Sequence, residues 1–580
     1  MLITYVCVYI SGGNEEMCSI AGILSKRGID VADSITDMLT CMPNRGPDGS
    51  GILLGDDILF FKSLRDLSQN HFSGEFALGH SRLAIVGGSS GRQPLQSCDG
   101  RFILVHNGEI YNYKEIRDEL SATHKFVTDS DSEVIVHLIE QYIKAGNNFV
   151  NAIKKTVAML DGIFAFAIRD RETGQIGLAR DQLGVRQLYY TENGDVFAFA
   201  SERKSLLRIV PKGDIRRVMP GMLVLIEGNF KLKEYEMIKP LSTGSRRKKI
   251  SYRTRDEAIS AYQKALLGSM KKRTMDLDMI GIIFSGGIDS VLVAYLAKSM
   301  VKKVVGYCGG LKGSTDIQFA KDIAKRLNLP LRINELTLDD VESMLPRIVD
   351  VIEDNNVGQV EVAIPIFAAV ETAHQDGMRV MYTGQGVDEL FGGYSWYPRI
   401  VEREGYRILG KHMADDLSLL YKETLEREDK IAMYHSVEIR EPYLDNEVVR
   451  VALRTNLELN VTGKNDAYGK RVHRDLAIKL GIPADIAYRK KEAAQHGSGI
   501  HDALDIIARN NGYDPSTIPE YYLKELVSRE KIGSSQRYGY NYGDLSLWAV
   551  PAHIQLYLDN LGYSRRPAIE IRRSKVADHN

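Results

Sequence analysis

The chain has almost no net charge and no apolar run of membrane-spanning length. Lys and Arg together number 75, against 76 Asp and Glu, over 580 residues. This balance removes the electrostatic argument for a nucleic-acid or membrane-surface partner. A bilayer-spanning helix needs about 20 consecutive apolar residues, and no run approaches that length. The chain is also too long for one hydrophobic core, so we expect two or more domains.

Cysteine is scarce as well, with five in the whole chain. The number is odd and no pair has CxxC spacing, so the sequence predicts neither a disulfide framework nor a zinc site. A reducing compartment fits this usage, and we expect a cytoplasmic protein. The opening segment MLITYVCVYI lacks the basic start and the cleavage site of a secretory signal.

Residues 18–205 have the pattern of short β-strands broken by turns. Runs such as GIFAFAIRD (162–170) are rich in β-branched and aromatic residues and are bounded by Gly, Asn and Asp. Two helices are predicted between them, near 112–121 and 131–145. This is an α+β pattern rather than a regular βαβ alternation.

The character changes after a basic, turn-rich stretch at 240–255, which we interpret as a linker. The apolar strand 279–284 precedes a glycine turn and a helix, and 304–310 and 379–384 are further candidates for buried strands. We therefore expect a parallel, doubly wound sheet in this part. Helical patterns dominate from about 400 to the end. The segment VEVAIPIF (360–367) is either a buried helix or a strand and could form a wall of the acceptor pocket.

FSGGIDS, residues 284–290, is the strongest local signal for chemistry. Its two glycines let backbone N–H groups approach an anion, and a helix begins directly after it. No GK[ST] follows, so this is not a Walker loop. It matches the pyrophosphate-binding loop of enzymes that cleave ATP to AMP and pyrophosphate. Asp289 fits such a loop if Mg²⁺ lies between carboxylate and phosphate. The alternative is a plain strand-to-helix turn with capping side chains.

TGQGVDELFGGY, residues 383–394, is a second glycine-rich turn after a strand. The carboxyl ends of strands in a doubly wound sheet meet at one crevice, so Asp388 could add a second magnesium carboxylate. The alternative is a glycine loop at the start of a helix. Lys490 and Lys491 follow in YRKKEAAQHGSG. One of them could stabilise departing pyrophosphate, although a pair of lysines is usually solvated.

In the first half of the chain, four short fragments together suggest a glutaminase. Cys18 offers a thiol, and Arg82 in HSRLAIV suits a carboxylate. Asn107 and Gly108 in HNGEIYN could form an oxyanion hole. Asp131 in SDSE suits an α-ammonium. The alternative for the cysteine alone is a buried, inert thiol.

The thiol needs a base, and no histidine is obviously paired with it. A free α-amine on Cys18, with a pKa of about 8, would serve. This chemistry requires the residues before Cys18 to be absent or removed. We expect a mis-called start codon, with Met17 as the true start, and a cleaved pro-segment as the second possibility. An intact extension predicts poor glutaminase activity, with free ammonia as the donor.

Together these and further motifs occur in the order of one known family. They are MCSIAGI, RGPDGSG, GHSRLAIV, QPL, NGEIYNY, SDSE, LDGIFAFAIRD, ARDQLGVRQLYY, FASERKSLL, FSGGIDS, TGQGVDELFGGY, VEIREPYLD and YRKKEAAQHGSG. The series resembles glutamine-hydrolysing asparagine synthetase of the class B type, over about residues 17–500. Some of these motifs are weak singly, but their order across two domains is highly specific.

The resemblance implies an α+β N-terminal-nucleophile sandwich followed by an α/β doubly wound parallel-sheet domain with a helical C-terminal part. The first domain would hydrolyse glutamine and release ammonia into an internal tunnel. The second would activate aspartate with ATP as an acyl-adenylate, from which ammonia displaces AMP. The expected divisions are an extension 1–17, the glutaminase domain 18–238, a linker 239–255, the synthetase domain 256–565 and a polar tail 566–580.

The resemblance also implies four groups of site residues. The catalytic residues would be Cys18, Asn107, Gly108 and Gln385. Glutamine would be bound by Arg82, Leu83, Ala84, Ile85, Val86, Asn107, Gly108, Glu109 and Asp131. ATP would be bound by Phe284, Ser285, Gly286, Gly287, Asp289, Ser290, Gly309, Thr383, Gly384 and Lys491. Magnesium would be held by Asp289 and Asp388.

Gln385 departs from the family pattern, where glutamate is usual and is thought to help form the adenylate. Glutamine cannot accept a proton at neutral pH, so either another group does that work or the acceptor is not aspartate. An amidotransferase for another carboxylate and a non-catalytic paralogue that binds glutamine or nucleotide are therefore the alternatives. A phosphoribosyl amidotransferase would lack the SGGxDS loop.

The partners implied are small molecules: glutamine, aspartate and ATP, with Mg²⁺ as the accompanying ion. No nucleic acid and no membrane are expected, and a homodimer is an assembly that the prediction allows.

Overall fold

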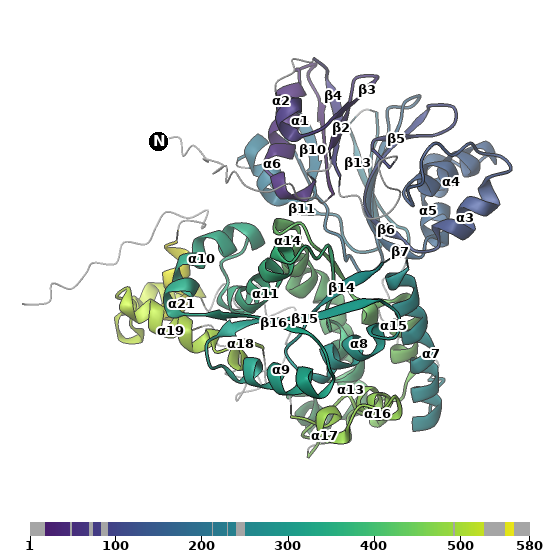
Figure 1. Ribbon diagram of the computed structural model, residues 1–580. Coiled ribbons are helices and arrows are strands. Elements are labelled where there is room, and N and C mark those ends of the chain that lie inside the picture. Colours follow the sequence, from purple (N-terminus) through teal and green to yellow (C-terminus); the bar gives the residue numbers. More distant parts are fainter. Residues whose placement is uncertain are drawn as a thin grey trace, which may run out of the picture. The chain divides into compact units, whose positions relative to one another are not determined.

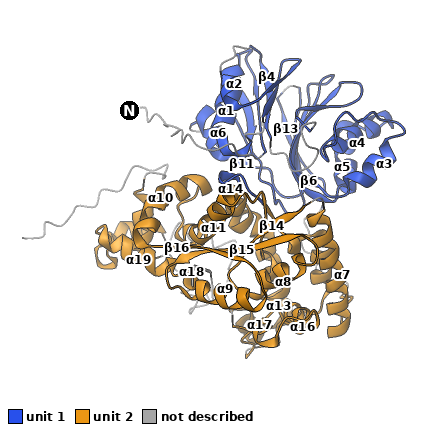
Figure 2. Cartoon of the chain, viewed as in Figure 1, with its two compact units in different colours: residues 1–243, 433–438 blue, residues 244–432, 439–580 orange. Residues whose placement is uncertain are grey.

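The computed structural model describes most of the chain. The described ranges are 18–46, 49–68, 73–82, 91–211, 213–228, 230–238, 250–275, 277–463, 465–490, 494–526 and 551–561. The chain divides into two compact units (Figures 1 and 2): unit 1 is Met1–Thr243 with Met433–Glu438, and unit 2 is Gly244–Ala432 with Ile439–Asn580. The predicted extension 1–17 and tail 566–580 lie outside the described residues, as does the predicted linker up to residue 249.

Within its described residues, unit 1 contains a seven-stranded and a six-stranded β-sheet. In spatial order the first sheet has β11 (Arg216–Arg217), β9 (Tyr189–Glu192), β10 (Val196–Ala200), β1 (Ser19–Ser25), β4 (Phe76–Ser81), β2 (Ser50–Leu54) and β3 (Asp57–Phe61). The second has β13 (Leu232–Glu236), β12 (Met222–Ile226), β8 (Ile176–Arg180), β7 (Gly162–Asp170), β6 (Phe102–Ile110) and β5 (Leu95–Gln96). Neighbouring strands run antiparallel in both sheets.

Helices cover the outer face of each sheet, so unit 1 has four layers. The helices of unit 1 are α1 (Ala32–Thr40), α2 (Leu64–Ser68), α3 (Tyr113–Leu120), α4 (Glu133–Lys144), α5 (Phe149–Met159) and α6 (Arg203–Ile209). Strand β6 shows how the layers arise from the period of a strand. Its Leu104 packs in a core with α3, α4 and α5, whereas the adjacent Val105 packs against the first sheet.

Both helices predicted in this half of the chain are confirmed, as α3 and α4. Helix α5 was not predicted, although its sequence carries the usual signals of a helix. Asn148 caps the helix by accepting the N–H of Asn151 at 2.9 Å, and Ile153 and Val157 are buried at helical spacing.

The sheet of unit 2 confirms the predicted parallel architecture. Its strands, in spatial order, are β16 (Leu331–Leu336), β15 (Lys303–Leu311), β14 (Met279–Ile283), β17 (Val380–Tyr382) and β18 (Glu438–Arg440). β14 pairs in parallel with both β15 and β17, and β15 pairs in parallel with β16. The chain first extends the sheet on one side of β14 and then returns to its other side. The carboxyl ends of β14 and β17 therefore form a topological switch point, where ligands bind in open α/β sheets.

Helices make up most of the rest of the second half of the chain. They are α7 (Arg255–Thr274), α8 (Ile288–Ala297), α9 (Thr315–Arg326), α10 (Leu338–Ile352), α11 (Val357–Gln375), α12 (Val387–Phe391), α13 (Tyr397–Leu420), α14 (Glu426–Tyr434), α15 (Asn446–Arg454), α16 (Arg471–Lys479), α17 (Ala484–Ala487), α18 (Ala494–Gly497), α19 (Ile500–Asn510) and α21 (Ala552–Asp559). Among the described residues, no helix combines the length and apolarity that crossing a bilayer requires.

The segment 360–367 is helical rather than extended, because it lies within α11. This helix packs directly on the sheet at Gly309 of β15. A Cβ atom added to Gly309 would lie 2.4 Å from the carbonyl oxygen of Pro365, so only glycine allows this approach.

Candidate functional site

A cavity in unit 1 brings together the residues that the sequence implicates in glutamine hydrolysis. Cys18, Arg82, Asn107, Gly108, Glu109 and Asp131 all line it. Leu83, Ala84, Ile85 and Val86, also predicted to bind glutamine, lie outside the described residues. Cys18 directly precedes β1 and is half-buried, and the loop that follows α3 brings Asp131 to the start of α4.

The middle of β6 supplies two donors to this cavity. Asn107 is 2% exposed, and its Nδ2 makes no hydrogen bond to any described residue. Gly108 has a φ of 147°, and a Cβ atom there would lie 2.1 Å from the carbonyl oxygen of Ile163. A buried amide donor without a partner is costly, so its position beside a cavity indicates a ligand atom to be bound. The two groups can therefore form an oxyanion hole.

Asp131 is buried, and its carboxylate is held by hydrogen bonds. Its Oδ2 accepts the N–H of Ile110 at 2.8 Å, and Ser130 Oγ donates to its Oδ1 at 3.3 Å. Burial raises its pKa to about 6, and the nearby Glu438 carboxylate adds to the rise. A bound ammonium would lower this pKa and keep Asp131 ionised. The buried guanidinium of Arg82 lines the same cavity and can pair with a carboxylate.

The two buried histidines near this site are poor bases. Burial lowers the pKa of His80 to about 3, and the nearby charge of Arg82 contributes. Burial likewise lowers the pKa of His106 to about 3, and there the nearby charge of Arg186 contributes. His106 lines the cavity, and its Nδ1 lies 2.8 Å from Ser132 Oγ. Both rings are therefore neutral at physiological pH, and such weakly basic rings are not suited to activating a thiol.

Two further charged residues of the cavity were missed by sequence reasoning. Arg186 Nη2 lies 3.7 Å from Glu438 Oε1, and both side chains are buried and line the cavity. Both lie in recognised motifs, ARDQLGVRQLYY and VEIREPYLD, which are far apart in the sequence. The motifs marked these positions, but only the fold brings them to the same site.

In unit 2, the two glycine-rich loops meet at the switch point of the sheet. The FSGGIDS loop joins β14 to α8. Gly286 has a φ of 70°, and a Cβ atom there would lie 3.1 Å from the backbone of Phe319. The second loop follows β17, and a Cβ atom on its Gly384 would lie 2.8 Å from Asp289 Cβ. Glycine at these positions leaves the backbone bare and lets the loops touch.

The predicted ATP residues fall into three groups in the structure. Those on or beside the two loops are Phe284, Ser285, Gly286, Gly287, Asp289, Ser290, Thr383 and Gly384. Gly309 lies near the end of the neighbouring strand β15, where it packs on α11. Lys491 lies outside the described residues.

Asp289 and Asp388 converge on one buried cation, the ammonium group of Lys470. Lys470 Nζ lies 2.6 Å from Asp289 Oδ2 and 2.8 Å from Asp388 Oδ1, and His473 Nε2 lies 3.3 Å from Asp289 Oδ1. Two carboxylates that share one positive charge form an oxygen donor set of the kind Mg²⁺ prefers. The residues present therefore fit a magnesium ion. Lys470 and His473 were missed from the sequence, because no motif marks them.

Gln385 is hydrogen-bonded to a buried carboxylate that was also missed. Its Nε2 donates to Oε1 of Glu428, which lies on α14 and is fully buried. Burial raises the pKa of Glu428 to about 7, although bonds from Gln385 and Thr383 and the nearby Arg427 favour its charged form. A carboxyl group with this pKa exchanges protons readily at neutral pH.

Comparison with known proteins gives consistent matches over both units. Residues 65–253 match the family described as glutamine amidotransferase domain, and residues 261–415 and 402–558 match asparagine synthase. The chain is 36% identical over 564 residues to "Putative asparagine synthetase (glutamine-hydrolyzing) 1" of Methanocaldococcus jannaschii, covering 89% of this chain and 100% of that protein. It is 30% identical over 504 residues to the nodule asparagine synthetase (glutamine-hydrolyzing) of Pisum sativum, covering 83% and 78%.

Proposed function

Because the chain belongs to the family of glutamine-hydrolysing asparagine synthetases, we propose that it converts aspartate to asparagine with ATP and glutamine. Glutamine is hydrolysed to glutamate and ammonia in the part 18–238. Aspartate is activated as an acyl-adenylate in the part 256–565, with release of pyrophosphate, and ammonia displaces AMP. The observation that carries the proposal is the cavity that Cys18, Asn107 and Asp131 share.

In the glutaminase step, the thiolate of Cys18 attacks the side-chain amide of glutamine. The negative charge that develops on the amide oxygen is stabilised by Asn107 Nδ2 and the N–H of Gly108. Arg82 and Asp131 hold the carboxylate and the ammonium of the substrate. The α-amine of Cys18, free in a chain that begins at this residue, takes the thiol proton and passes it to the departing nitrogen as the C–N bond breaks and ammonia leaves. Water then hydrolyses the thioester left on Cys18, which releases glutamate and restores the thiol. The four layers of unit 1 support an N-terminal-nucleophile sandwich.

In the synthetase step, the bare backbone around Gly286 and Gly287 binds phosphate oxygens, aided by the start of α8. Asp289 and Asp388 would hold a magnesium ion, which compensates the negative charge of the pyrophosphate. Lys491 matches the position of a lysine that stabilises departing pyrophosphate.

We assign to Glu428 the proton transfer that Gln385 cannot perform. Gln385 occupies the position where the resemblance expects a glutamate, and its amide contacts Glu428 directly. The site therefore still contains a carboxyl group, which belongs to Glu428, beside Gln385, and not to residue 385 itself. With a pKa of about 7, Glu428 can accept a proton from ammonium at neutral pH.

The test is a product assay with glutamine, aspartate and MgATP. We expect asparagine, glutamate, AMP and pyrophosphate in equal amounts.

The second candidate, an amidotransferase for another carboxylate, is favoured by Gln385. It predicts glutamate release without asparagine, and AMP formation only when a different acceptor is offered. Binding of glutamine or nucleotide without any turnover would contradict both and point to a sensor.

A further inference from the structure

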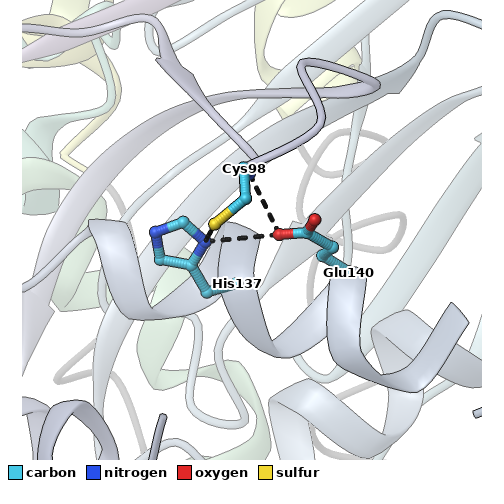
Figure 3. A group of neighbouring side chains, drawn as sticks. All are labelled: Cys98, His137 and Glu140. Carbon is cyan, nitrogen blue, oxygen red and sulfur yellow. Dashed lines mark hydrogen bonds and ion pairs between the residues drawn. The ribbon is translucent and has the colours of Figure 1, made fainter. Parts of the chain in front are cut away.

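A cluster of metal-binding side chains lies in unit 1, apart from the residues that line the glutamine cavity. Cys98 is in the turn between β5 and β6, and His137 and Glu140 are one helical turn apart on α4 (Figure 3). Cys98 Sγ lies 3.7 Å from His137 Nδ1, which lies 3.5 Å from Glu140 Oε2. All three donor atoms lie within 4.8 Å of one another.

The distances of 3.7 and 3.5 Å from His137 Nδ1 match those between neighbouring donors in a coordination shell. Donor atoms at the corners of a tetrahedron lie about 3.3–3.8 Å apart when metal–ligand bonds are about 2.0–2.3 Å long, as they are for Zn²⁺. Sulfur, imidazole nitrogen and carboxylate oxygen are also the three ligand types that zinc takes from proteins. Cys98 is exposed, so an ion can reach the cluster from solvent.

The surroundings of His137 are those of a metal ligand. Its other ring nitrogen, Nε2, lies 3.3 Å from Oε1 of Glu133, whose carboxylate is fixed by the N–H groups of Val127 and Thr128 at 2.7 and 2.8 Å. A carboxylate that accepts a hydrogen bond from one ring nitrogen of a histidine keeps the proton on that nitrogen. The other ring nitrogen, here Nδ1, is then free to bind a metal. Both side chains are fully buried.

His124 lies at the edge of the cluster and offers a further donor atom. His124 is 7% exposed, and its Nε2 makes no hydrogen bond within the part of the chain that the structure describes. This atom lies 3.6 Å from Glu140 Oε2, while Thr123 Oγ1 occupies the other ring nitrogen at 2.9 Å. A buried nitrogen without a hydrogen bond needs an explanation, and a bound ion that both this nitrogen and the Glu140 carboxylate contact would provide one.

The charges around the cluster also favour a cation. Two carboxylates, Glu133 and Glu140, lie beside His137, and the ammonium group of Lys144, which is half exposed, lies 2.5 Å from Glu140 Oε1. Glu140 Oε2 remains directed at the cluster, where it accepts the N–H of Cys98 at 3.0 Å.

We propose that Cys98, His137 and Glu140 bind a structural zinc ion, with His124 as the nearest donor for the fourth position. The Cys98 thiol gives up its proton to solvent when the ion binds. The ion would link α4 to the β5–β6 turn. Since Asp131 lies two residues before α4 begins, the site would brace the segment that presents this carboxylate to glutamine.

The test is zinc binding by the full chain after treatment with a chelator. Zinc chloride is added, loosely held metal is removed, and bound zinc per chain is measured by elemental analysis. We compare the unchanged chain with Cys98→Ser and with Cys41→Ser, which removes another thiol of the same unit. The unchanged chain and Cys41→Ser should retain one more zinc per chain than Cys98→Ser. Glu133→Gln should weaken binding by about 10- to 100-fold.

Cobalt gives a second readout that does not depend on stoichiometry. Co²⁺ bound by a thiolate produces a charge-transfer band in the near ultraviolet, which should be present in Cys41→Ser and absent in Cys98→Ser. Cys98 is exposed, so its replacement leaves the fold intact, which circular dichroism would verify. Equal zinc retention in all three proteins, or a cobalt band that persists without Cys98, would overturn the proposal.

Discussion

At the scale of the residue, Asn107 offers the most direct test of the glutamine site. Asn107→Ala removes the buried side-chain donor of the proposed oxyanion hole, and we expect glutamate release to slow by about 10²–10³-fold. Asparagine formation from added ammonium chloride should be unchanged, because unit 2 keeps its own residues. Asn151→Ala, at an exposed position of α5, is the matched control. Full glutaminase activity in Asn107→Ala would exclude this role.

Glu428 carries the corresponding prediction for the synthetase site. Glu428→Gln should lower the rate of AMP formation by about 10²–10⁴-fold, because it removes the proposed proton acceptor. Exchanging the two residues, as Gln385→Glu with Glu428→Gln, should restore much of that rate. Steady-state rates with ammonia as donor would measure both effects. An unchanged rate in the single variant would remove Glu428 from the mechanism.

The pKa of Glu428 also predicts how the protein responds to pH. Its carboxylate form accepts the proton, so the synthetase rate should rise as pH increases through about 7, and Glu428→Gln should lose this inflection. Folding raises this pKa from 4.5, so the stability it contributes is present below pH 4.5 and is lost as pH rises through about 7. Between about pH 6 and pH 8, the free energy of unfolding measured with denaturant should fall more in the unchanged chain than in Glu428→Gln.

At the scale of the element, the turn from β14 into α8 depends on backbone that only glycine provides. Gly286→Ala adds a Cβ atom 3.1 Å from the Phe319 backbone and forces alanine into a positive φ, which costs about 1–2 kcal/mol. Gly313 also has a positive φ, of 81°, so Gly313→Ala carries a similar backbone cost, but its added Cβ atom would have no atom within 4 Å. Both variants should therefore unfold earlier in denaturant.

Their nucleotide binding should differ. Gly286→Ala should bind ATP more weakly by at least about tenfold, since the loop must shift, while Gly313→Ala should bind as the unchanged chain does. Calorimetric titration with MgATP measures this difference. Equal affinities in the two variants would mean that the loop does not cradle phosphate.

How far the elements could be predicted depends on how local their signals are. The strand β14 is an apolar run because it is buried on both faces, so its sequence alone identified it. The helix α4 was equally clear from its buried residues at helical spacing. Glu428 and Lys470 carry no such signal. Glu428 lies on α14 and Lys470 directly precedes α16, and only the tertiary structure brings these segments to the two glycine-rich loops.

At the scale of the whole molecule, the proposed mechanism predicts that the start of the chain controls one half of the reaction only. A chain begun at Met17, from which methionine is removed, should release glutamate from glutamine. A chain that retains residues 1–17 should not, because Cys18 then has no free α-amine to take the thiol proton. Intact mass and N-terminal sequencing identify each form. Ammonia-dependent asparagine synthesis should be equal in both, and equal glutaminase activity would contradict the N-terminal base.

The short segment Met433–Glu438 belongs to unit 1, although the chain has by then passed through most of unit 2. It supplies Met433 and Glu438 to the lining of the cavity that also contains Cys18. During translation, the ribosome releases these residues only after β14, its phosphate loop and α8 have been made. A nascent chain therefore cannot complete the wall of the proposed glutamine cavity before the strands β14 to β17, beside which we place the synthetase step, have been synthesised.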